Sequence, residues 1–168
     1  AWGGKRHQSQ YEGTMQKIIS LFQRNYDGDH LVRDQVVPGA AWVLANEGIA
    51  TQKYDGTCCM IDQGHLWKRY ELKKGRTAPP NFRAAQQVDL VTGDIPGWLP
   101  VGNGREDQYH REAFAHHREQ HGVDQSDCDT YELVGPKIQG NPEGYSHHEL
   151  LLHEAAHPLP DAPRDFAG

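Results

Sequence analysis

The stretch KYDGTCCMIDQGHLWKRY, residues 53–70, decides the predicted fold. It opens with one lysine against an Asp-Gly turn, and the runs CCMI and HLWKRY then flank Asp62, Gln63 and Gly64. Two such runs on either side of a tight turn predict a β-hairpin. The preceding run, AWVLANEGIATQ at 41–52, is rich in Ala, Val, Ile and Thr, so we expect another strand there that leads into Lys53.

Lys53 is the candidate nucleophile. An amine attacks phosphorus or a carbonyl carbon only after it loses its proton, which burial or cationic neighbours promote. A lysine at the end of a strand would stand on a rigid element. The motif K-x-D-G is short, however, and the alternative is a surface lysine that precedes a hairpin.

The composition predicts a single soluble domain, with 168 residues and 36% hydrophobic content. No apolar run approaches the ~20 residues that cross a bilayer, and no secretory layout opens the chain, so we expect a cytoplasmic protein without membrane contact. Cys58 and Cys59 would point to opposite faces of a strand. We therefore expect these thiols and Cys128 to be reduced and packed, rather than bound to a metal.

The formal charge of −6 is unevenly distributed. Residues 1–85 carry 12 Lys or Arg against 8 Asp or Glu, whereas residues 86–168 carry 5 against 15. A basic cluster follows the candidate nucleophile and suits a phosphate-bearing ligand, although a solvated strand and loop is the alternative. Its members are Lys68, Arg69, Lys73, Lys74 and Arg76. The overall acidity argues against a broad grip on duplex nucleic acid, so any such contact should be local.

The rest of the chain predicts few regular elements. Residues 1–14 lack periodicity and are expected to form a disordered tail or extension, with residues 15–168 making up the domain. The run MQKIISLFQRN is compatible with a short helix or an edge strand. Residues 71–105, rich in Gly and Pro, predict an irregular connection anchored by Trp98. A helix is expected at about 107–121, before Gly122.

A second informative stretch is TYELVGPKIQGNPEG, residues 130–144. It predicts a short strand that carries Glu132 into a loop of tight turns. A carboxylate in this position can accept hydrogen bonds from ribose hydroxyls, while the alternative is an ordinary surface glutamate.

These stretches together resemble the RNA ligases of the covalent nucleotidyltransferase superfamily, in the family that includes a vertebrate cytosolic ATP-dependent RNA ligase and bacterial relatives. The resemblance rests on four motifs in order, and it runs from Met15 to Gly168. The motifs are KYDGTCC, LWKRYELKKG, IPGWLPV and YELVGPKIQGNPEG. It implies an α+β fold, a nucleotidyltransferase (ATP-grasp-like) core of antiparallel sheets with few helices.

The implied activity is ATP-dependent RNA joining. A lysine that matches Lys53 attacks the α-phosphorus of ATP with the help of Mg²⁺, which gives lysyl-AMP and pyrophosphate. The AMP then moves to an RNA 5′-phosphate, and a 3′-hydroxyl displaces it. By position, Arg69 matches an arginine that contacts the nucleotide or its phosphates, and Glu132 matches the glutamate that contacts the ribose. Further residues expected at the nucleotide are Lys68 as a second cation and Asp55 and Gly56 in the turn.

Two family motifs have no match. Complete ligases carry a later E-G-(I/V) strand and a lysine pair, but Glu143 and Gly144 precede Tyr145, and Lys137 is the only lysine after Lys74. We therefore expect a ligase domain that is incomplete at its C-terminus. A module that binds nucleotide or RNA ends without catalysis is the alternative.

The segment HEAAH, residues 153–157, also matches the H-E-x-x-H pattern of zinc hydrolases. Pro158 follows at once and takes His157 out of helical geometry, so we expect this match to be accidental. The remaining histidine pairs are expected to be exposed, with adventitious metal binding as the alternative. They comprise His116, His117, His121, His147 and His148.

Overall fold

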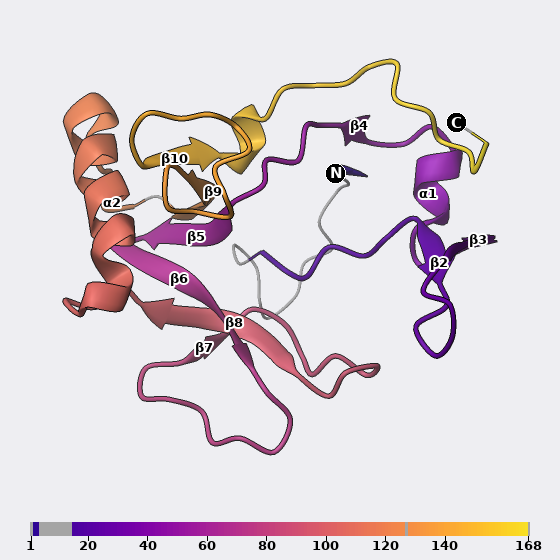
Figure 1. The fold of residues 1–168 in the computed structure, drawn as a ribbon, viewed down its shortest axis with the longest axis horizontal. Coiled ribbons are helices and arrows are strands. Elements are labelled where there is room, and N and C mark those ends of the chain that lie inside the picture. The colour runs from indigo at the N-terminus through magenta and orange to yellow at the C-terminus, as the bar shows by residue number, and fades with distance from the viewer. Residues whose placement is uncertain (1, 4–14, 127, 168) are drawn as a thin grey trace. The chain divides into compact units, whose positions relative to one another are not determined.

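The computed structural model describes residues 2–3, 15–126 and 128–167 (Figure 1). Of the tail predicted over 1–14, only Trp2 and Gly3 belong to the described residues. The predicted domain organisation stays a prediction. The chain divides into two compact units. The first comprises residues 17–53 and 157–167 with Trp2 and Gly3, and the second comprises residues 15–16 and 54–156.

The second unit is built on one six-stranded sheet in which every pair of neighbouring strands is antiparallel. The order across the sheet is β10-β9-β5-β6-β8-β7, so β5 and β6 lie at its centre. The strands are β5 (Thr57–Asp62), β6 (His65–Leu72), β7 (Arg83–Ala84), β8 (Ile95–Pro100), β9 (Cys128–Val134) and β10 (Glu149–Leu152).

The predicted hairpin is confirmed. Strands β5 and β6 pair from Cys59 with Lys68 to Asp62 with His65. The turn residues Gln63 and Gly64 have φ of 49° and 77°, the left-handed conformation that two-residue hairpin turns require. The predicted strand that carries Glu132 is also confirmed, as β9.

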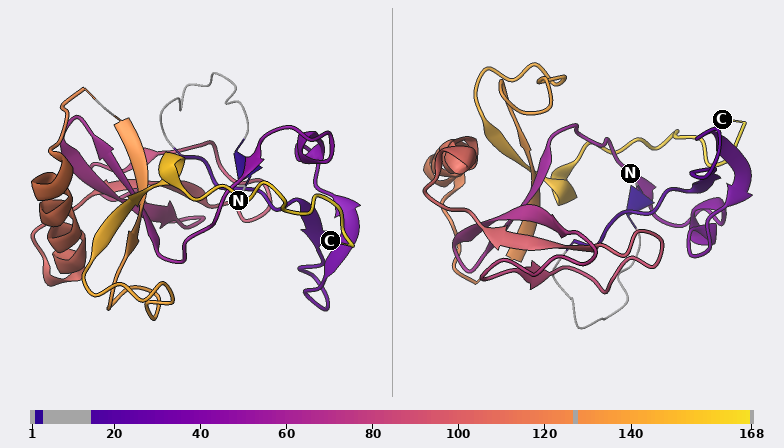
Figure 2. Two further views of the ribbon diagram at one scale, coloured as in Figure 1. Left: turned by 90° about the horizontal axis from the view of Figure 1, so that it is seen from above. Right: turned by 60° about the horizontal axis from the view of Figure 1, so that its bottom comes forward.

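One face of the sheet packs against α2 (Gln108–His121), which the 3₁₀ turn η1 (Arg105–Asp107) precedes, as Figures 1 and 2 show. The helix bounds agree with the predicted 107–121, and Gly122 follows the helix with a positive φ. Alternate residues of the strands fill the core beneath the helix, because side chains of a strand point to opposite faces in turn. The buried members are Cys59, Ile61, Leu66, Ala113, Tyr131, Leu133 and Leu150.

The opposite face holds a second core, centred on Trp98. This side chain is fully buried, with Met60 and Ala85 against it. The prediction of an irregular connection over 71–105 is wrong in part, because β7 and β8 lie within it. Gly97 explains the misleading composition, since a Cβ there would lie 2.5 Å from the carbonyl oxygen of Arg83 on β7. Glycine in a strand here marks a close backbone approach rather than a loop.

The first unit contains short elements only. They are β1 (Trp2–Gly3), β2 (Phe22–Arg24), β3 (Val32–Val36), α1 (Ala41–Leu44) and β4 (Ile49–Ala50). Strand β2 settles the ambiguity of the run MQKIISLFQRN, and it pairs with β3. The β-strand predicted over 41–52 is wrong in its first part, where α1 lies, whereas Ile49 and Ala50 of its second part form β4. The guanidinium of Arg164 donates to the carbonyl oxygens of Val43, Glu47 and Gly48 and so satisfies groups at the end of this helix.

The fold class predicted as α+β, with antiparallel sheets and few helices, agrees with this architecture. Among the described residues, no helix is long and apolar enough to cross a membrane. The assignment to a nucleotidyltransferase core stays a prediction.

Replacing Trp98 by Ala should lower the free energy of unfolding by about 3–5 kcal/mol, because the change leaves a cavity in the centre of the second core. The indole Nε1 has no hydrogen-bond partner among the described residues, so Trp98→Phe should cost less than Trp98→Ala. Urea denaturation measures both, with Val91→Ala as the control because Val91 is 87% exposed. Equal losses for Trp98→Ala and Val91→Ala would contradict the burial of this indole.

Candidate functional site

Strand β5 brings two of the predicted site residues to one face of the sheet. Its register places Cys58 opposite Glu132 of β9. On its other side Cys59 pairs with Lys68, so one step along the ladder Cys58 lies opposite Arg69 of β6. Paired residues of adjacent strands point to the same face. Arg69, Cys58 and Glu132 therefore form a row across three strands, on the face away from α2.

The turn before β5 fits tightly against β9. A Cβ on Gly56 would lie 2.2 Å from the carbonyl oxygen of Leu133 and 3.0 Å from Cγ of Glu132. Only glycine permits this approach, which sets the start of β5 beside the glutamate. The backbone amide of the preceding Asp55 donates to Oε1 of Glu143 at 3.4 Å, and the Asp55 side chain is exposed.

Arg69 is a half-buried cation with a fixed orientation. Its Nη1 donates to the carbonyl oxygen of Met15 at 2.6 Å, and its guanidinium lies 4.8 Å from the ring centroid of Trp98. Burial lowers the pKa of this guanidinium from its ordinary value, but arginine stays charged in proteins. The fork retains further N–H donors that can bind a phosphate.

Glu132 is held by a histidine. Nε2 of His153 lies 2.8 Å from Oε2 of Glu132, and Nδ1 of the same ring lies 2.9 Å from Oγ1 of Thr130. These contacts leave Oε1 of Glu132 to accept hydrogen bonds from a ligand. His153 belongs to η2 (His153–Ala155), a 3₁₀ turn of three residues. The α-helix that the H-E-x-x-H motif needs is thus absent from HEAAH, as expected.

Lys68 does not join Arg69 and Glu132. It points to the opposite face, where its Nζ lies 2.6 Å from Oδ1 of the buried Asp107. Burial raises the pKa of Asp107, but hydrogen bonds from Lys68 and from the amide of Gly102 together bring it below its ordinary value. Within the described structure, Lys68 thus ties β6 to the start of α2.

The other predicted cations are distributed differently. Lys53 is exposed and is the last residue of the first unit, directly before Tyr54 of the second. Lys73 pairs with Glu71 and Asp94, each at 3.0 Å. The side chain of Lys74 packs beside Gly93. Lys68, Lys73 and Lys74 therefore do not gather around Arg69, which is the residue of the basic cluster that lies in the row with Glu132.

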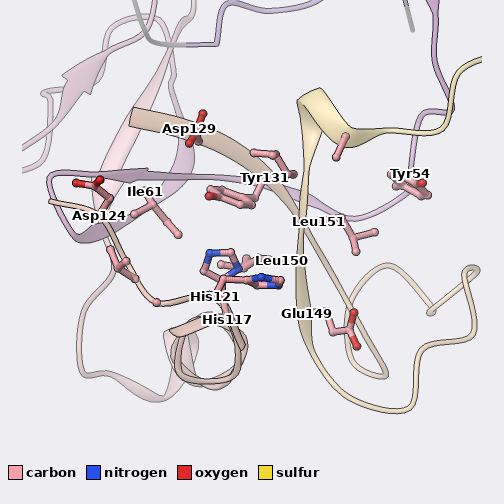
Figure 3. Close-up of a pocket in the computed structure, with 14 residues that line it drawn as sticks. Tyr54, Ile61, His117, His121, Asp124, Asp129, Tyr131, Glu149, Leu150 and Leu151 are labelled. Carbon is pink, nitrogen blue, oxygen red and sulfur yellow. The ribbon is translucent and has the colours of Figure 1, made fainter. Parts of the chain in front are cut away.

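A cavity of about 590 Å³ opens between the C-terminal half of α2 and strands β9 and β10 (Figure 3). His117, His121, Ile61 and Tyr131 line it, and Figure 3 shows the two imidazoles facing the tyrosine ring. This cavity belongs to the helix-covered side of the sheet. Arg69 and Glu132 do not line it, so it is separate from the row across β6, β5 and β9.

The sequence analysis does not predict two members of the site, because it treats His153 only as part of HEAAH and Cys58 only as a packing residue. Strand alternation along β5 puts Cys58 on the same face as Glu132, so the position of Cys58 is predictable from the sequence. Nothing in the sequence placed His153 beside Glu132, because the 14-residue connection from β9 to β10, residues 135–148, conceals the register of the two strands.

An arginine and a hydrogen-bonded glutamate, two strands apart on one face of an antiparallel sheet, suit a ligand that carries both phosphate and hydroxyl groups. The chain is 27% identical to RNA ligase 1 of Pongo abelii and 24% identical to RNA ligase 1 of Rattus norvegicus and of Mus musculus. Each match covers 62% of this chain and 50% of the relative.

These matches support a distant RNA ligase-like relationship. The chain spans about half the length of the curated relatives it matches. No family model matches the chain.

Cys58 should be unreactive in the folded protein. Burial raises the pKa of its thiol to about 12, although the charge of Arg69 opposes this shift. A pKa higher by about three units makes the thiolate fraction near neutral pH about a thousandfold smaller, and only the thiolate is a nucleophile. Iodoacetamide labelling at pH 8, followed by peptide mass spectrometry, should modify Cys58 only after denaturation. Rapid labelling of Cys58 in the native chain would contradict its burial.

Gly56→Ala should destabilise the second unit, because the new methyl group would collide with the backbone of Leu133. Overpacking of this kind costs about 1–3 kcal/mol. Gly102→Ala is the matched control, since its Cβ would meet its nearest neighbour at 3.4 Å. Chemical denaturation of both variants measures the difference, and equal stability would refute the close approach.

Proposed function

We propose that this chain is a nucleotidyltransferase domain of an ATP-dependent RNA ligase, in which Lys53 accepts AMP. The observation that carries the proposal is the row of Arg69 and Glu132 beside the turn at the end of the K-x-D-G motif. The distant relationship to RNA ligase 1 supports the same reading. Neither the motif nor the relationship alone specifies a nucleotide, but the side chains on this face supply the groups that one needs.

Arg69 and Glu132 have complementary roles in the proposal. The guanidinium contacts the nucleotide phosphates, where its fork neutralises charge that spreads over the oxygens during transfer. The free carboxylate oxygen of Glu132 accepts a hydrogen bond from a ribose hydroxyl. His153 orients that carboxylate through Oε2 and so fixes the direction in which Oε1 points.

Lys53 is assigned to the site through the sequence. It stands three residues before Gly56, and three residues of extended chain span at most about 11 Å. In the first step the neutral amine forms a bond to the α-phosphorus of ATP and loses a proton, while the bond to the bridging oxygen breaks and pyrophosphate leaves. In-line displacement of this kind depends chiefly on alignment and charge neutralisation.

Mg²⁺ fits the oxygen atoms of this region rather than its other donors. The carboxylate of Asp55 would hold it together with phosphate oxygens and water, since Mg²⁺ prefers oxygen ligands and retains waters. The thiol of Cys58 and the imidazole of His153 are unsuited to it. When bound, the ion neutralises charge on the phosphates. Lys68, on the other face, is left as a structural cation in this proposal.

The partners proposed for the later steps are RNA ends. The AMP group passes from Lys53 to a 5′-phosphate, and a 3′-hydroxyl then displaces AMP to form a phosphodiester. The chain spans about half the length of its curated relatives. The RNA-joining activity of the whole protein is therefore something that we propose from this part of it.

Intact mass spectrometry after incubation with ATP and Mg²⁺ tests the first step. The parent chain should gain the mass of one AMP group, and mild acid should remove it because a phosphoramidate bond is acid-labile. Lys53→Ala and Lys53→Arg should gain nothing, since neither has an amine that can attack. Lys74→Ala is the matched control and should react like the parent chain.

Variants of the nucleotide contacts refine this test. Arg69→Ala and Glu132→Gln should slow adduct formation by on the order of ten- to a thousandfold, as expected for the loss of a charge-stabilising or orienting group. An adduct that persists in Lys53→Ala, or failure of the parent chain to react, would overturn self-adenylylation. ATP binding by a parent chain that forms no adduct would favour the alternative of a non-catalytic nucleotide-binding module.

A further inference from the structure

We propose that His116, His147 and Glu149 form a zinc site that links helix α2 to strand β10. One potential ligand atom from each of these residues lies within 4.8 Å of the other two. Two imidazoles and one carboxylate are a donor set that Zn²⁺ favours, with a fourth position left for water. The site is independent of the nucleotide proposal, because neither Arg69 nor Glu132 contributes to it.

The backbone at the start of β10 places two of the ligands together. His147 lies in the bend directly before β10, and Glu149 is the first residue of the strand. Nε2 of His147 lies 2.5 Å from Oε1 of Glu149. His148, between them, is engaged separately, because it is buried, stacks on Tyr109 and lies 2.9 Å from Oε1 of Glu112.

The third ligand comes from α2. The ring centroids of His116 and His147 are 4.5 Å apart, with the planes inclined by 68°. Ligand atoms bound tetrahedrally at about 2.0–2.2 Å from zinc lie roughly 3.3–3.6 Å from one another. The 2.5 Å between Nε2 of His147 and Oε1 of Glu149 is shorter than this, so zinc binding requires a side-chain rotation that separates these two atoms.

A hydrogen bond outside the ligand set is a second, independent observation. Oγ of Ser146 lies 3.1 Å from Nδ1 of His147. When the hydroxyl accepts from Nδ1–H, the lone pair of the ring is on Nε2, the nitrogen that faces Glu149. Zinc-bound histidines usually have their other ring nitrogen held in this way.

Two rival arrangements in the described structure are weaker. Cys58, Glu132 and His153 also have ligand atoms within 4.8 Å of one another, but Cys58 is flanked by β6 and β9 on the central strand β5 and Glu132 is assigned to the nucleotide. His117 and His121, one turn apart on α2, have ring centroids separated by 5.0 Å and line the cavity of Figure 3. They supply two ligands, and among the described residues no third ligand atom lies within 4.8 Å of both to complete a set.

Titration of the full chain with ZnCl₂, followed by calorimetry and thermal denaturation, tests the site. The parent chain should bind one Zn²⁺ at this site and melt at a higher temperature, because the ion binds only the folded state. His147→Ala and Glu149→Gln should abolish both effects. Ser146→Ala should weaken binding about tenfold, the cost of losing an orienting hydrogen bond to a ligand.

The controls separate the rivals. His121→Ala, on the same helix, should bind Zn²⁺ like the parent chain. Cobalt substituted for zinc should show no sulfur charge-transfer absorption, because no thiolate belongs to the site. Loss of binding in His121→Ala, a thiolate band that Cys58→Ser removes, or absence of binding by the parent chain would each overturn the proposal.

Discussion

Strand β5 is held between β6 and β9 by two antiparallel ladders, and Gly56 allows it to begin in direct contact with the backbone of Leu133. The candidate site depends on this double pairing. A shift of one residue in either ladder would send Arg69 or Glu132 to the face covered by α2, since side chains alternate. The missing side chain of Gly56 thus helps to determine that Arg69 and Glu132 share one face of the sheet.

The sequence predicted the centre of the second unit well and its periphery poorly. The hairpin of β5 and β6 follows from local signals, a turn between two β-like runs, and α2 follows from helical spacing and Gly122. Within the run 41–52, the sequence misses α1 but not the strand at Ile49 and Ala50, because a short apolar segment fits a strand or a helix and contacts elsewhere in the chain decide between them. In β8, Pro96 and Gly97 imitate a loop, although Gly97 is needed for close packing against β7.

The candidate site was predictable where it depends on alternation, and not where it depends on long connections. Arg69 and Lys68 are adjacent on one strand, so the period of two already implies that they face opposite ways. The buried carboxylate of Asp107 accounts for the side that Lys68 takes. The pairing of His153 with Glu132, in contrast, requires the register of β9 with β10, which the turns over residues 135–148 determine.

The contact between Arg69 and Trp98 has an optical consequence. Among Trp42, Trp67 and Trp98, only Trp98 is fully shielded from water, and a guanidinium lies over its ring. The emission of an indole responds to charge in its immediate surroundings. A phosphate that drew the guanidinium of Arg69 toward itself would therefore change the fluorescence of Trp98. Under the proposed function, Trp98 would report occupancy of the face that bears Glu132.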